Sequence, residues 1–135
     1  MVKLLLAGFL AAHGLIHASF LSPAPPASAG GPPWPFDMAK SWLVTHAGVD
    51  AGLVTLIGTA LVGLTVIGFG LSALAAAGWL VPAELWRPVV VASVAASALL
   101  LTLFFHPFLL LGFVIDAAIV WAVFVMSWNP ALDSN

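Results

Sequence analysis

Four long stretches of this chain are almost free of charge, and each is long enough to form a helix that crosses a bilayer. They cover residues 2–21, 49–80, 89–105 and 108–128, and each holds at most one charged side chain. A helix needs about 20 predominantly apolar residues to span the hydrocarbon core of a membrane. The sequence therefore predicts an all-α fold, an integral membrane four-helix bundle that forms a single transmembrane domain over residues 1–135.

The low charge excludes most soluble classes of protein. Only 6% of the residues are Asp, Glu, Lys or Arg, against about 25% in soluble domains. A soluble enzyme and a nucleic-acid binder are both excluded. So few charges could form neither the charged surface that keeps an enzyme soluble nor the basic surface that binds nucleic acid. The chain has no cysteine, which excludes disulfides and thiolate metal sites. We expect membrane lipid as the main partner, together with a larger membrane complex or further copies of the chain.

A long proline-rich loop separates the first two spans. Residues 22–48 hold six of the ten prolines, which predicts irregular or extended chain, and residues 38–46 could form a short interfacial helix. Five of the six tryptophans fall at predicted membrane edges, as expected for an aromatic belt. Small residues should bring the helices together. The candidate positions are Gly8 and Ala12 in the first span, Ala51, Thr55, Thr59 and Gly63 in the second, and Ser93 and Ser97 in the third.

The few cationic residues favour one orientation. Lys3 and Arg87 would share one side of the membrane and Lys40 would lie on the other. The positive-inside rule then places the N-terminus in the cytoplasm, by two charges to one. An alternative is that residues 1–29 form a signal peptide cleaved after Ala27-Ser28-Ala29. Cleavage would remove His13 and His17 from the mature protein.

Ionisable residues inside a membrane are costly, and they usually face the interior of the bundle or water. The topology places one group of them at a single mouth of the bundle, beside the long loop. Deeper in, His13 lies eight residues from the end of its span and Asp116 lies eight from the start of its own. At 1.5 Å per residue both lie about 12 Å from that mouth, so we expect His13 and Asp116 to be partners. The residues of the mouth are His17, His46, Asp50 and His106.

This arrangement suggests several kinds of site. His13 and His17 are four residues apart and share a helix face, the spacing with which two imidazoles hold one metal ion. A third ligand could come from His106, Asp50 or Asp116. One haem could lie between His17 and His106. A one-sided pocket for a quinone head group or another small ligand is a third alternative, and hydrogen bonding between helices without any ligand is a fourth. The candidate cofactor-binding residues are His13, His17, His106 and Asp116, and no catalytic residue is predicted.

Two functions follow from these alternatives, and they belong to different classes. The first is a ligand-binding or redox-accessory protein that holds a metal ion, a haem or a quinone in a one-sided His/Asp pocket. The second is a structural or assembly subunit of a larger membrane complex, in which the same residues only lock helices together. Whether the chain is an enzyme is left open.

Three segments carry a resemblance to known proteins. They are AAHGLIHASFLSP at 11–23, WPFDMAKSWL at 34–43 and FFHPFLLLGFVIDAA at 104–118. Together they resemble small four-helix integral membrane proteins of bacteria that have a His-Gly-Leu-Ile-His first helix and no established activity. The chain is also loosely similar to DoxX-like proteins, although Leu15-Ile16-His17 stands where those often carry a basic residue. The resemblance implies a multi-pass protein of the bacterial inner membrane.

Overall fold

The computed structural model describes residues 1–26, 31 and 33–129, and this part of the chain is helical without any strand. Four of its helical segments are long and apolar enough to cross a membrane: Val2–Leu21, Ala51–Ala77, Ala83–Leu103 and Pro107–Phe124. The expectation of an all-α chain with four long apolar segments is therefore confirmed. The proposed cleavage site at Ala27-Ser28-Ala29 lies outside the described residues.

Each long segment combines an α-helix with a short 3-10 turn, except the second. The first is α1 (Val2–Ile16) continued by η1 (His17–Leu21), and the second is α3 (Ala51–Ala77). The third joins η3 (Ala83–Leu85) to α4 (Trp86–Leu103), and the fourth joins η4 (Pro107–Leu109) to α5 (Leu110–Phe124). Two short helices, η2 (Met38–Lys40) and α2 (Trp42–Thr45), replace the single interfacial helix expected over 38–46.

Local signals in the sequence explain where α3 begins and ends. The Asp50 side chain accepts a hydrogen bond from Leu53 N at 2.9 Å, which satisfies one of the free N–H groups of the first turn. The helix ends at Gly78, whose φ of 78° is readily adopted only by glycine. Between these caps α3 continues as one helix through Gly68 and Gly70.

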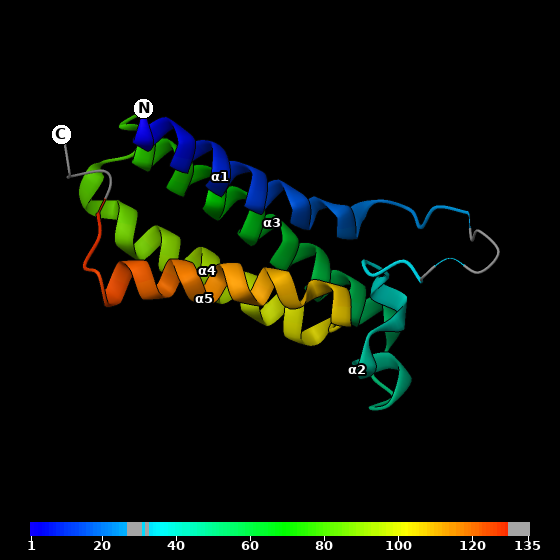
Figure 1. Ribbon diagram of the computed structural model, residues 1–135. Helices are drawn as coiled ribbons and strands as arrows, with labels where there is room; N and C mark the ends of the chain where they lie inside the picture. The colour runs from blue at the N-terminus through cyan, green and yellow to red at the C-terminus, as the bar shows by residue number, and fades with distance from the viewer. Residues whose placement is uncertain (27–30, 32, 130–135) are drawn as a thin grey trace.

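The two ends of the bundle are distinct (Figure 1). The N-terminus, the turn between α3 and α4, and the last turn of α5 lie at one end. Residues 33–50, which include α2, lie at the other end together with the turn between α4 and α5. This agrees with the predicted topology, in which the long loop and the turn at His106 share one mouth.

Three glycines lie where two of the long helices approach each other closely. A Cβ atom on Gly14 of α1 would lie 2.7 Å from Phe69 Cβ of α3, and one on Gly112 of α5 would lie 2.8 Å from a Leu101 methyl of α4. A Cβ on Gly68 of α3 would overlap the side chain of Ser93 on α4. The helices therefore pack in the order α1, α3, α4 and α5, with α3 between α1 and α4.

The expected small-residue faces are correct for α4 and wrong for α1 and α3. Ser93 and Ser97 are buried, but Gly8 and Gly63 have no heavy atom of another element within 4 Å of a built Cβ. The residues that face outward include Ala12 of α1 and Ala51, Thr55 and Thr59 of α3. The error has a physical reason: in an apolar environment large aliphatic residues suit both faces, so spacing alone does not identify the packed one.

The loop before α3 is tied to the end of α4. Ser41 Oγ donates to the carbonyl oxygen of Leu103 at 2.6 Å, and Trp42 Nε1 donates to that of Thr102 at 3.0 Å. The last four carbonyl groups of a helix have no partner within the helix itself. Residues some 60 positions earlier in the chain thus satisfy the end of α4, and they fix the loop at this mouth.

Candidate functional site

Four polar side chains from three of the long segments form a continuous hydrogen-bonded network in the interior. His13 Nε2 lies 2.9 Å from Asp116 Oδ1, and Ser97 Oγ lies 2.6 Å from Asp116 Oδ2. The same Ser97 oxygen is 2.9 Å from His17 Nε2. We call His13, His17, Ser97 and Asp116 the polar quartet. The expected pairing of His13 with Asp116 is confirmed.

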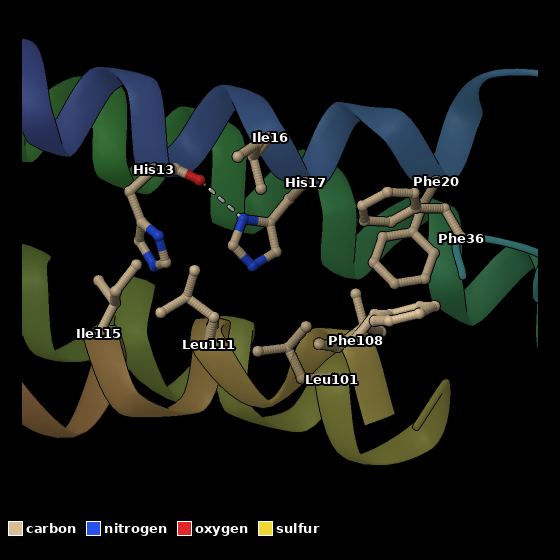
Figure 2. A pocket seen from close by; sticks show the side chains of 11 residues that line it. His13, Ile16, His17, Phe20, Phe36, Leu101, Phe108, Leu111 and Ile115 are labelled. Carbon is tan, nitrogen blue, oxygen red and sulfur yellow. Dashed lines mark hydrogen bonds between the residues drawn. The ribbon is translucent and has the colours of Figure 1, made fainter. Parts of the chain in front are cut away.

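The sequence places the two imidazoles on one face of the first segment. Because they are four residues apart, His17 Nδ1 reaches the carbonyl oxygen of His13 at 2.9 Å. Phe69 of α3, which is fully buried, packs edge-on against the His13 ring with centroids 4.8 Å apart. Gly14 allows this approach, because any side chain there would meet Phe69. The two rings therefore point from α1 toward α4 and α5 (Figure 2), and Phe69 of α3 packs against both of them.

The polar quartet is enclosed, so each hydrogen-bond donor in it must find an acceptor within the protein. Its four residues are between 0% and 5% exposed. A carbonyl oxygen can only accept, so His17 Nδ1 carries a proton and donates it to His13 O. Ser97 has one hydroxyl proton but makes two short contacts, with His17 Nε2 and with Asp116 Oδ2. A second proton must therefore lie in one of these contacts, on the imidazole or on the carboxyl group.

With a neutral His13, two arrangements satisfy this count, and both have zero net charge. If Ser97 donates to Asp116, then His17 donates to Ser97 and the site holds an imidazolium and a carboxylate. If Ser97 donates to His17, then Asp116 is a neutral acid that donates to Ser97. They differ only by the movement of protons along the chain from Asp116 through Ser97 to His17. A neutral network is the form that a buried, weakly solvated site favours.

A cavity of about 130 Å³ lies beside the polar quartet. His13 and His17 form its polar wall (Figure 2). The remaining wall is apolar and partly aromatic, and it comes from Ile16, Phe20, Phe36, Leu101, Phe108, Leu109, Leu111, Gly112 and Ile115. An apolar cavity of about 150 Å³ in another protein takes up benzene. The space beside the imidazoles is therefore the size of one six-membered ring.

The other predicted residues of the mouth lie outside the polar quartet. His106 is partly exposed, and its Nδ1 accepts from Phe108 N at 3.3 Å. His46 pairs with the neighbouring Thr45 hydroxyl at 2.8 Å, and Asp50 caps α3. In the described part of the chain no three of the His, Asp and Glu side chains are grouped as ligands for one metal ion. The expected convergence of His106 with His13 and His17 does not occur, because His106 belongs to the turn that starts η4.

Comparison with known proteins adds no assignment. No family model, curated protein or solved structure matches this chain. The resemblance to small bacterial four-helix proteins therefore stays a prediction. What the site can do has to be inferred from its own geometry.

Ser97 is the member of the site that the sequence analysis assigned only to packing. A small hydroxyl residue in an apolar helix usually bonds to a carbonyl of its own helix, as Ser93 Oγ does with Val89 O at 2.7 Å. A signal was nonetheless present. Ser97 lies nine residues before His106 and Asp116 lies ten residues after it, so the two should share a depth on either side of the turn.

Proposed function

We propose that the chain is an integral membrane protein that binds a small ring-bearing ligand in the cavity between α1 and α5, next to the polar quartet. The single observation that carries this proposal is the ring-sized cavity bounded on one side by two buried imidazoles. In this proposal the four apolar segments cross the bacterial inner membrane with the N-terminus in the cytoplasm. The cavity then opens nearer the outer mouth.

A ligand with a single six-membered ring fits this site better than a metal ion or a haem. Both nitrogens of His17 are engaged, with His13 O and with Ser97 Oγ, so His17 has no lone pair to offer an iron atom. His106, the expected second haem ligand, is bonded within its own turn. A porphyrin is also much larger than the cavity. A single ring needs neither free ligands nor a larger space.

The test uses 4-fluorophenol as a reporter, followed by ¹⁹F NMR with the protein in phosphatidylcholine nanodiscs. We expect saturable binding of one molecule per chain. Ile16 and Leu15 are neighbours on α1 with 61% and 62% exposure, but only Ile16 lines the cavity. Ile16→Trp should weaken binding at least about tenfold, and Leu15→Trp should leave it unchanged. Uniform partitioning into the nanodiscs, without saturation in any of the three proteins, would overturn the proposal.

A second candidate function has its own support. Asp116 and His17 are fully paired within the chain, which favours a structural or assembly subunit whose polar groups only lock helices together. On this proposal the cavity is incidental. The chain would then copurify with other membrane proteins, and 4-fluorophenol would show no saturable site.

A further inference from the structure

The chemistry of the ligand follows from the one ring nitrogen that the polar quartet leaves free. This inference rests on the proposed function. His13 Nδ1 has no hydrogen-bond partner in the described part of the chain. In the same part of the chain, the side-chain nitrogen and oxygen atoms that are both fully buried and without a partner are Trp34 Nε1, Thr65 Oγ1 and Trp86 Nε1. His13 Nδ1 is not one of them, so it is not fully buried. Since His13 lines the cavity, this nitrogen is the polar atom that a ligand can reach.

The hydrogen-bond count shows whether His13 Nδ1 donates or accepts. In both neutral arrangements of the polar quartet, His13 Nε2 donates its proton to Asp116 Oδ1. A neutral imidazole with a proton on Nε2 has a lone pair on Nδ1. The cavity therefore presents a hydrogen-bond acceptor, which pairs with a hydroxyl group and not with a carbonyl oxygen.

The outer wall of the cavity indicates where the rest of the ligand lies. α1 packs on α3 and α5 packs on α4, whereas α1 and α5 have little close backbone contact. Three cavity residues at this gap are also exposed on the outer surface: Ile16 at 61%, Phe108 at 63% and Leu111 at 68%. Side chains that line the cavity thus also form part of the outer surface. In a bilayer that surface faces acyl chains.

We propose that the cavity takes the phenolic ring of an amphiphile dissolved in the membrane. Its hydroxyl group donates to His13 Nδ1, and its apolar tail leaves sideways between α1 and α5 into the lipid. Phe20, Phe36 and Phe108 supply the aromatic wall against which such a ring packs. A hydroquinone with an alkyl or prenyl tail is a member of this class.

The test compares two competitors that differ by one O-methyl group, which removes the hydrogen-bond donor. 4-Octylphenol and 4-octylanisole are titrated against bound 4-fluorophenol on the unmodified protein, with concentrations expressed per lipid. We expect 4-octylphenol to displace the reporter and 4-octylanisole to compete about tenfold more weakly, the difference that one hydrogen bond makes. Equal competition by the two compounds would overturn the proposed hydrogen bond from the ligand hydroxyl to His13 Nδ1. Failure of 4-octylphenol to displace the reporter would overturn the lateral opening, because the octyl tail is too long for the cavity alone.

A pair of variants tests the lateral opening on the α5 side. Leu111 lines the cavity, whereas Val114, with 63% exposure, does not. Leu111→Trp should weaken 4-octylphenol binding and Val114→Trp should not, and equal effects would overturn the opening. These results can be told apart from a failure of the proposed function. If the proposed function is wrong, 4-fluorophenol itself shows no saturable binding.

Discussion

His13 and Asp116 lie 103 positions apart in the chain and are joined by a hydrogen bond of 2.9 Å. The bond connects α1 with α5, two helices that otherwise have little close backbone contact. It is therefore a specific link across the most open side of the bundle. Its loss should be felt in both the stability of the fold and the shape of the cavity.

Asp116→Asn should be nearly neutral, whereas Asp116→Leu should destabilise the fold by about 1–3 kcal/mol. An asparagine amide can donate to Ser97 and accept from His13, which reproduces the neutral acid of the polar quartet. Leucine has a similarly branched side chain but leaves both partners unpaired. The measurement is the free energy of unfolding in mixed detergent micelles on titration with dodecyl sulfate. A large cost for asparagine would show that Asp116 is ionised, as in the arrangement that pairs an imidazolium with a carboxylate.

Ser97→Ala should cost about 1–3 kcal/mol of unfolding free energy, because His17 Nε2 and Asp116 Oδ2 both lose their partner. Ser93→Ala is the matched control, one turn away on α4 and equally buried. Its hydroxyl bonds only to Val89 of its own helix, so we expect a cost below about 1 kcal/mol. Equal costs in the same titration would remove Ser97 from the network.

Gly14→Ala should destabilise the protein by about 1–3 kcal/mol through overpacking. The added methyl group would lie 2.7 Å from Phe69 Cβ, which is attached directly to the α3 backbone and cannot swing away. Gly8→Ala, two turns earlier on α1, meets no heavy atom within 4 Å and should be neutral or slightly stabilising. A thermal melt of the two variants, side by side in detergent, checks the difference.

The protonation of His13 can be observed directly. ¹⁵N NMR of the protein labelled at histidine should show His13 with a protonated Nε2 and a bare Nδ1. On addition of 4-octylphenol the bare nitrogen should report a new hydrogen bond, and 4-octylanisole should leave it unchanged. His13 with protons on both nitrogens in the free protein would contradict the neutral network.

His106→Ala should leave 4-fluorophenol binding unchanged and alter stability by less than about 1 kcal/mol. Its imidazole makes one long hydrogen bond within its own turn and contacts the Phe108 ring. Reporter titration and a thermal melt measure the two quantities. A tenfold loss of binding would restore His106 to the site that the sequence analysis first expected.

The depth of residues could be predicted from the sequence, and their direction around each helix could not. A fixed rise per residue placed His13 and Asp116 at one level from the lengths of their spans. The same arithmetic placed His106 at the mouth correctly but could not show that its side chain would bond within its own turn. The four-residue spacing of Thr55, Thr59 and Gly63 suggested a packed face, yet both threonines are exposed and a Cβ atom on Gly63 would meet no neighbour within 4 Å.

The hydrogen bonds of the polar quartet also make the fold dependent on the order of synthesis. His13 emerges from the ribosome early, whereas Ser97 and Asp116 follow only with α4 and α5. Until the last helix joins the others, two imidazoles and then a carboxyl group lack their final partners. An incomplete chain thus exposes polar groups that a finished one conceals.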